Sequence, residues 1–157
     1  MKNWLKFILS IVIVELVAFI GSLATISSIP TWYATITKPS FNPPNWIFGP
    51  VWTILYLMIA VSLFLVWKSK AKTSLKKKAH TIFAIQLFLN MLWSLIFFGA
   101  HEILSALAII VLLWIAIFLN ILAFRKISKT ASWLLVPYWL WVTFASFLNL
   151  AIWMLNK

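Results

Sequence analysis

The sequence predicts an all-α integral membrane protein, a bundle of five transmembrane helices. Of its 157 residues, 64% are hydrophobic and only 10% are charged, whereas a soluble domain carries roughly 25% charged residues. Five apolar segments each approach the roughly 20 residues that a helix needs to cross the hydrocarbon core of a bilayer. Lipid must therefore be the solvent for most of the chain. The length allows a single domain, 1–157, with little beyond the spans and their connections.

The five expected spans lie at about residues 7–28, 46–67, 79–100, 103–124 and 133–155. Only Glu15 interrupts the first, and this residue and the length of the run favour a retained span over a cleaved signal peptide. The second contains no charge, and the third carries His80, Gln86 and Asn90. The fourth follows almost directly, which predicts a tight antiparallel pair. Pro137 near the start of the fifth predicts a bend.

Basic residues predict the orientation in the membrane. One side collects eleven of them: Lys2, Lys6, Lys68, Lys70, Lys72, Lys76, Lys77, Lys78, Arg125, Lys126 and Lys129. The other side has Lys38 and Lys157. Since basic residues stay on the cytoplasmic side, we expect a multi-pass protein with a cytoplasmic N-terminus, in the cell membrane if the source is prokaryotic.

Several functional classes are excluded. The formal net charge of +11 would suit nucleic acid, but membrane topology already explains the lysines, so no nucleic-acid partner is expected. There is no cysteine, and His80 and His101 form no cluster with metal-ligand spacing, so no metal site is expected. No arrangement typical of hydrolytic or group-transfer catalysis is evident.

The long first loop, residues 29–45, is rich in proline and aromatic residues. It holds Pro30, Pro39, Pro43 and Pro44 together with Trp32, Tyr33 and Phe41. Prolines restrict the unordered chain, and long loops with such content are usually functional or disordered. We expect an ordered lid over one end of the bundle; the alternative is an interfacial anchor.

Three spans carry aromatic or amide stripes at helical spacing. Gln86, Asn90, Trp93 and Phe97 share one face of the third span, and Pro137, Trp141, Ala145 and Asn149 share one face of the fifth. The second has Trp52 and Tyr56 one turn apart. Such stripes can serve as contacts between helices or face a ligand. Converging under an aromatic loop, they would form a mostly apolar pocket suited to a flat, polycyclic ligand.

Glu15 is the one carboxylate expected within a span. An intramembrane carboxylate is costly and therefore suggests a proton relay or a ligand contact. The other interpretation is a protonated or paired residue in helix packing.

Longer motifs surround these positions. They are Trp32-Tyr33, Lys38-Pro39-Ser40-Phe41-Asn42-Pro43-Pro44-Asn45-Trp46, Phe48-Gly49-Pro50-Val51-Trp52, Leu89-Asn90, Phe97-Phe98-Gly99, Pro137-Tyr138, Phe144-Ala145 and Leu148-Asn149. Together with Gln86, Trp93 and Trp141, they resemble the tryptophan-rich sensory protein family, which includes the mitochondrial translocator protein or peripheral benzodiazepine receptor. The resemblance covers nearly the whole chain.

The resemblance implies a five-helix membrane fold, commonly a homodimer, that acts as a receptor or sensor. It implies binding of tetrapyrroles such as protoporphyrin IX and of benzodiazepine-type and isoquinoline carboxamide ligands, with light-dependent oxidative porphyrin degradation in some members. Porphyrin would be ligand or substrate, and no further cofactor is implied. By motif position the catalytic residues would be Trp52 and Trp141, and the ligand-binding residues Tyr33, Trp52, Asn90, Trp93, Trp141, Ala145 and Asn149.

One departure bears on the ligand. Animal members end the fifth span with a tyrosine followed by a basic residue, a motif read as a cholesterol site. Here Leu150 occupies the tyrosine position and no basic residue follows before Lys157, so cholesterol is not an expected partner. The rival functions are a transporter of porphyrins or other hydrophobic molecules and a non-catalytic membrane adaptor.

Overall fold

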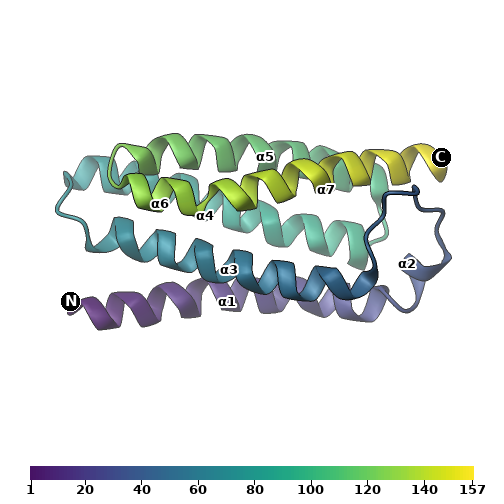
Figure 1. Cartoon of the computed structure of the whole chain (residues 1–157), viewed down its shortest axis with the longest axis horizontal. Coiled ribbons are helices and arrows are strands. Elements are labelled where there is room, and N and C mark those ends of the chain that lie inside the picture. The colour runs from purple at the N-terminus through teal and green to yellow at the C-terminus, as the bar shows by residue number, and fades with distance from the viewer.

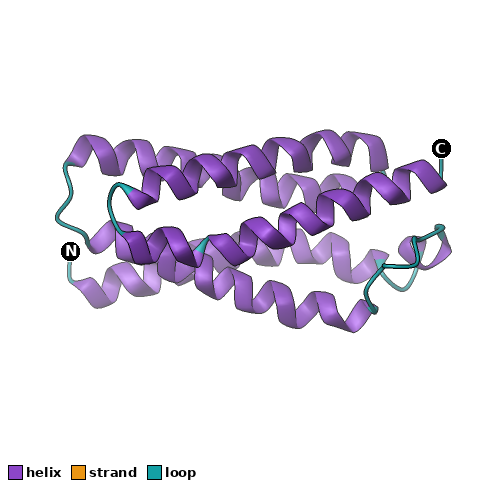
Figure 2. Cartoon of the chain, turned by 45° about the horizontal axis from the view of Figure 1, so that its top comes forward, coloured by secondary structure: helices purple, strands orange, loops and turns teal.

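The computed structural model describes all 157 residues and consists of helices and connections, with no strand (Figure 2). The five long helices are α1 (Asn3–Ser28), α3 (Asn45–Lys68), α4 (Thr73–Ser94), α5 (Ile103–Arg125) and α7 (Val136–Leu155). Two short helices, α2 (Trp32–Thr35) and α6 (Lys129–Leu134), precede α3 and α7, and the π-helix η1 (Leu95–Gly99) continues α4. Five segments are long and apolar enough to cross a membrane, which confirms the predicted fold class.

The long helices lie side by side as an up-and-down bundle, and the two termini lie at opposite ends (Figure 1). Helix α4 packs along α5, α1 along α3, and α5 along α7. The predicted antiparallel pair of the third and fourth spans is thereby confirmed. Many large apolar side chains stay exposed around the outside, such as Phe19, Leu112 and Phe147, as expected where lipid rather than water surrounds the helices.

The largest differences from the predicted spans lie in the third and the fifth, and the first helix also begins earlier, at Asn3 rather than near residue 7. The third long helix begins at Thr73 rather than near residue 79, so its first turns contain a lysine cluster. One of these lysines is anchored to the end of α3, since Lys76 Nζ donates to the Trp67 and Ser69 carbonyl oxygens at 3.0 and 3.1 Å. The fifth span is interrupted at Leu135, between α6 and α7. The missing N–H of Pro137, in the first turn of α7, accounts for this interruption.

The turn between η1 and α5 is very short. The π-helix η1 before it has about one more residue per turn than an α-helix, a feature that is frequent at functional sites. It carries Phe97 and Phe98. His101 then adopts a positive φ of 60°, which few side chains tolerate. Its imidazole stacks on Trp32 with ring centres 4.4 Å apart, so the first loop packs onto this turn.

Close packing of α1 against α4 depends on Gly21. The Ser94 hydroxyl donates to the Gly21 carbonyl oxygen at 2.8 Å. A β-carbon at Gly21 would stand 3.4 Å from Ser94 Cβ, in van der Waals contact, so a side chain longer than that of alanine would push the helices apart. Small residues permit such contacts between membrane helices.

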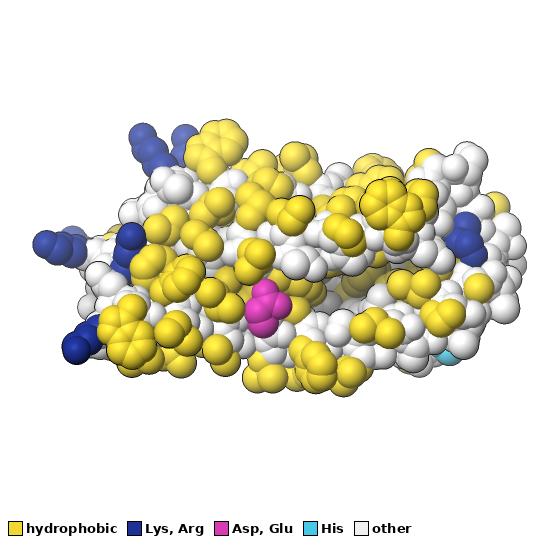
Figure 3. Space-filling view, turned by 60° about the horizontal axis from the view of Figure 1, so that its bottom comes forward, with side chains coloured by type: hydrophobic (Ala, Val, Ile, Leu, Met, Phe, Trp, Pro, Cys, Tyr) yellow, Lys and Arg dark blue, Asp and Glu magenta, His cyan; other side chains and the backbone are white.

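The two ends of the bundle are packed differently. At the end that holds the N-terminus, buried apolar side chains such as Val66, Phe83 and Phe124 fill the space between the helices. At the other end a smaller cluster gathers around Tyr33, Phe97 and Phe98. Blue basic side chains collect at one end of the space-filling view, with a single group at the other (Figure 3).

This charge separation predicts which loops face the cytoplasm. The chain has no cysteine, so single cysteines can report sidedness without background. We expect Ser40→Cys, in the exposed first loop, to react with a membrane-impermeant maleimide in intact bacterial cells. Ser74→Cys, at the exposed start of α4, should react only after permeabilisation. The opposite pattern would reverse the predicted orientation.

Candidate ligand pocket

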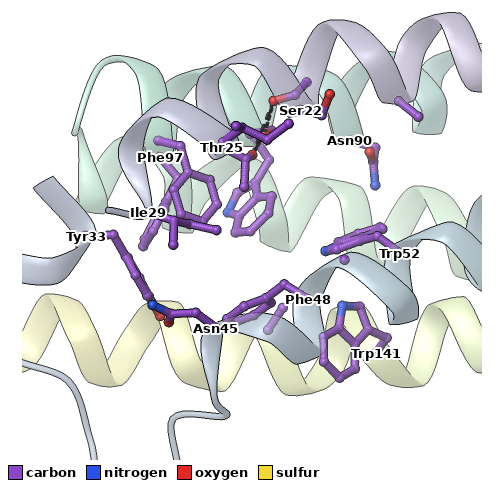
Figure 4. A pocket seen from close by; sticks show the side chains of 18 of the residues that line it. Ser22, Thr25, Ile29, Tyr33, Asn45, Phe48, Trp52, Asn90, Phe97 and Trp141 are labelled. Carbon is purple, nitrogen blue, oxygen red and sulfur yellow. Dashed lines mark hydrogen bonds between the residues drawn. The ribbon is translucent and has the colours of Figure 1, made fainter. Parts of the chain in front are cut away.

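A pocket of about 560 Å³ occupies the half of the bundle that faces the first loop (Figure 4). Its walls come from α1, α3, α4 with η1, and α7, and the first loop closes its end. All seven predicted ligand-binding residues line it: Tyr33, Trp52, Asn90, Trp93, Trp141, Ala145 and Asn149. Folding therefore brings these residues together from four separate segments, and their contact with a ligand stays a prediction.

Aromatic rings form most of the wall and hold one another in place. Trp52 stacks on Tyr56 with centroids 5.3 Å apart, and Trp93 stacks on Phe97 at 5.6 Å. Trp141 packs beside Phe144 at 5.4 Å. Ring pairs with these separations are favourable beyond their buried area. The pocket is thus preformed and lined by fixed indole and phenyl groups.

Asn90 joins three helices beneath this aromatic wall. The Tyr56 hydroxyl of α3 donates to Asn90 Oδ1 at 2.7 Å, and Asn90 Nδ2 donates to the Tyr138 hydroxyl of α7 at 2.9 Å. Asn90 and Tyr138 are almost fully buried. Because buried amides in lipid need partners, this chain fixes α3, α4 and α7 relative to one another.

Asn149 makes a second connection of the same kind. Trp93 Nε1 donates to Asn149 Oδ1 at 3.1 Å, and Asn149 Nδ2 donates to the Ile103 carbonyl oxygen at 3.0 Å. The two amides therefore border the pocket while their hydrogen bonds join helices. These positions of the stripes thus serve as contacts between helices and also face the cavity. The indole N–H groups of Trp52 and Trp141 are bonded to no protein acceptor and remain available to a ligand.

Two members of the predicted stripes do not line the pocket. Gln86 is fully buried in α4, and neither of its amide atoms has a hydrogen-bond partner in the chain. Pro137 lies in the first turn of α7, outside the pocket lining. The ligand-facing interpretation therefore applies to only part of each stripe, because each stripe extends beyond the length of the pocket.

The first loop is ordered by its own polar contacts. The Tyr33 hydroxyl donates to Asn42 Oδ1 at 2.6 Å, and Lys38 Nζ donates to the Tyr33 and Ile36 carbonyl oxygens at 2.6 and 2.9 Å. Burial raises the pKa of Tyr33 to about 12, although the hydrogen bond to Asn42 opposes the rise. The phenol therefore stays protonated, and remains a donor to Asn42, throughout the neutral range.

The loop is also tethered to distant parts of the chain. Asn156, at the end of α7, accepts from the Thr37 backbone N–H at 3.0 Å and donates to the Thr37 carbonyl oxygen at 2.8 Å. Loop residues Ile29 and Tyr33 contribute to the pocket lining. These contacts order the loop beside the end of the pocket, and its role as a lid stays a prediction.

Helix α1 forms a wall of the pocket that the sequence reasoning missed. Its lining residues include Glu15, Ala18, Ser22 and Thr25, and Ile29 follows at the same period just past the end of the helix. Their spacings of three, four, three and four mark one helix face, and a search for small and polar residues at that period would have found it. The Thr25 and Ser94 hydroxyls, 2.8 Å apart, share a hydrogen bond across this wall.

Glu15 lies at the end of the pocket nearer the middle of the bundle, with Tyr56 and Asn90 also in the lining there. Its side chain is half-buried and forms neither a hydrogen bond nor an ion pair within the chain. The structure therefore provides no partner for the paired residue considered from sequence. As the one acidic residue in the lining, it is available to ligand or to protons.

The pocket is open on one side, between α1 and α3. Its rim includes Phe19 and Ile26 of α1 and Trp46 of α3, all well exposed. Figure 3 shows this face of the molecule hollowed beside an acidic side chain. Since these surfaces lie within the apolar spans, the opening faces the bilayer.

These features define a class: a polytopic α-helical membrane protein with a preformed aromatic pocket open to lipid. A sequence model of the TspO/MBR family matches residues 10–154. The chain belongs to this family, as the motifs predicted.

Individual relatives agree with this assignment. The chain is 46% identical to the tryptophan-rich protein TspO of Archaeoglobus fulgidus, over 98% of this chain and 99% of the relative. It is 49% identical to the protein of the same name from Chlorobaculum tepidum, over 89% of both chains. Similarity to the human translocator protein is 36% identity over 86% of this chain and 80% of the relative.

The Asn90 connection predicts a loss of stability on substitution. Asn90→Leu keeps a similar volume but removes two hydrogen bonds between helices. At about 0.6 kcal/mol for each such bond in a membrane protein, the free energy of unfolding should fall by about 1 kcal/mol. This corresponds to about 2–4 °C in melting temperature in detergent.

The matched control is Thr81→Val, which removes a hydrogen bond made only within α4, to the Lys77 carbonyl oxygen. It should melt close to the wild type. Equal melting temperatures for Asn90→Leu and the wild type would show that the Asn90 connection does not stabilise the bundle.

Proposed function

We propose that the chain is a membrane receptor that binds tetrapyrroles such as protoporphyrin IX, and also accepts benzodiazepine-type and isoquinoline carboxamide ligands. The observation that carries the proposal is the pocket itself, bordered by Trp52, Trp93 and Trp141. Its volume of about 560 Å³ lies within the 300–1,000 Å³ range usual for ligand sites. Family membership supports the ligand classes.

The shape and polarity of the wall favour flat, sparingly polar molecules. In Figure 4, Trp52, Phe48 and Trp141 lie across an open space from Thr25 and Phe97. Asn90 and Asn149 direct their polar atoms to neighbouring helices, so the wall presents mainly ring faces and edges. Offset stacking on indole rewards extended ring systems.

A receptor fits this structure better than a transporter does. The pocket lining extends from the first loop only as far as Glu15, Tyr56 and Asn90. Beyond it, buried side chains such as Ile59 and Phe83 fill the bundle. Passage to the other side would require this core to open. A homodimer is a further expectation from the family, and cholesterol remains outside the proposal because of Leu150.

Binding can be tested with a variant that fills the pocket. Protoporphyrin IX should quench the intrinsic tryptophan fluorescence of the detergent-solubilised protein at micromolar concentration. Ala145→Phe places a ring in the pocket beside Trp141 and Phe144 and should weaken binding at least tenfold. Ala108→Phe, on the exposed face of α5, is the matched control and should bind as the wild type does.

Absence of quenching at these concentrations would refute the receptor and favour the adaptor. Equal quenching of both alanine variants would place the ligand elsewhere on the protein.

We further propose that the pocket promotes light-dependent oxidative degradation of bound porphyrin. A photoexcited ring stacked on Trp52 or Trp141 can accept an electron from the indole and pass it to dissolved dioxygen, which becomes superoxide. The indole radical cation then takes an electron back from the porphyrin, and the porphyrin radical cation combines with superoxide to give an oxygenated ring. Dioxygen is thus the net oxidant, and the indole is restored. Both indoles lie in the pocket wall, and neither N–H is bonded to a protein acceptor.

The degradation step has its own test. Trp52→Phe combined with Trp141→Phe should retain porphyrin binding by ring stacking but lose most of the light-dependent decrease in porphyrin absorbance under air. Samples kept in the dark measure any loss without light, and mass analysis identifies the product. A wild-type rate in the double variant would rule out electron transfer from these indoles.

A further inference from the structure

We propose that the chain has a second binding site, separate from the aromatic pocket, that holds one anionic phospholipid at the basic end of the bundle. A groove of about 460 Å³ lies between α1, α3 and α4 there. Nine of its ten lining residues are hydrophobic. It shares no lining residue with the aromatic pocket, and the proposal is independent of the function proposed above.

The groove has the dimensions of one leaflet. Its lining on α4 extends from His80 to Met91, eleven residues or about 16 Å along a helix. Half of a typical hydrocarbon core is about 15 Å. Its floor is built from the buried side chains of Leu63, Phe83 and Leu87. An acyl chain laid in this groove would extend from the basic end to the middle of the membrane.

Polar groups stand where the phosphate of such a lipid would lie. Lys76 Nζ is held by the carbonyl oxygens of Trp67 and Ser69. An ammonium group has three donors, so one remains for another acceptor. Nε2 of His80, in the groove lining, is buried without a hydrogen-bond partner in the chain. Trp67 and His80 pack edge to face, with ring centres 6.3 Å apart, at this end of the groove.

The charge of this end selects an anionic head group. Lys77 lies one turn before His80 on α4 and is exposed, and Lys70 follows Trp67 by three residues. The chain has only two acidic residues, Glu15 in the middle of α1 and Glu102 at the opposite end. No carboxylate therefore neutralises the lysines around the groove.

Charge rather than the apolar groove must provide the selectivity. Lipid tails are as apolar as the side chains, so an acyl chain gains only packing by entering the groove. Each lysine near an anionic surface contributes about a fivefold preference. The site should therefore distinguish phosphatidylglycerol from phosphatidylcholine with the same acyl chains.

Trp67 allows the site to be observed directly. The full-length protein is placed in phosphatidylcholine nanodiscs that contain a small fraction of phosphatidylglycerol with brominated acyl chains, which quench nearby indoles. The difference in quenching between the wild type and Trp67→Phe isolates the contribution of Trp67. We expect that contribution to be several-fold larger than with brominated phosphatidylcholine at the same mole fraction.

Two pairs of variants separate the groove from the charge. Ala84→Phe fills the groove and should abolish the quenching of Trp67, while Ala108→Phe on α5 should leave it unchanged. Lys77→Gln should lower the preference for phosphatidylglycerol about fivefold. Lys126→Gln removes an exposed charge at the same end, after α5 and outside the groove lining, and should have no effect.

Equal quenching by the two brominated lipids would overturn the proposal, as would quenching that survives Ala84→Phe. A change from dimer to monomer in Ala84→Phe, without any dependence on lipid charge, would assign the groove to a second copy of the chain and also overturn it. Lys77→Gln changes only an exposed side chain, so the test of charge stands even if Ala84→Phe does not fold.

Discussion

The hydrogen bonds of two buried amides, Asn90 and Asn149, fix how four helices meet around the pocket. Asn90 and Asn149 are buried away from water, so each forms hydrogen bonds to neighbouring helices through both its amide oxygen and its amide nitrogen. Those bonds join α3, α4, α5 and α7 around the space that becomes the pocket. They also engage both polar atoms of each amide with neighbouring helices, so the tryptophans give the cavity most of its chemical character. The same constraint thus holds the bundle together and makes its cavity aromatic.

The two halves of the bundle differ in structure: one is packed with buried side chains, and the other contains the pocket. Toward the basic end, buried side chains such as Val66 and Phe124 fill the centre of the bundle, beside the groove between α1, α3 and α4. Toward the first loop, regular packing is replaced by the π-helix η1, which carries Phe97 and Phe98, and by the contact of Gly21 with Ser94. Irregular backbone in a membrane protein is tolerated where protein or a cavity surrounds it. These departures lie in or near the half of the bundle that contains the pocket.

Much of this arrangement could be predicted from sequence, because length and polarity define membrane spans and helical spacing defines faces. Trp52, Asn90, Trp93 and Trp141 were placed in one cavity on that basis and by family resemblance. Sequence periodicity could not show where a stripe leaves the cavity, so it could not separate Gln86 from Asn90 and Trp93 on the same helix face. The wall provided by α1 was missed because Ala18, Ser22 and Thr25 look like ordinary packing residues until another helix faces them.

The early start of α4 was missed because its lysines appear too polar for a helix in a membrane protein, although Lys76 forms hydrogen bonds to the end of α3.

Because the pocket opens to lipid between α1 and α3, the apparent affinity of the protein for a ligand depends on the membrane as well as on the site. A ligand that reaches the site through that opening is drawn from the bilayer, where flat apolar molecules accumulate far above their aqueous concentration. The occupancy of the site then depends on partitioning between water and membrane as well as on contacts with Trp52 or Trp141. Diluting the protein with additional lipid at fixed total ligand lowers occupancy, although no contact has changed. Membrane composition is therefore itself a variable in how this pocket responds.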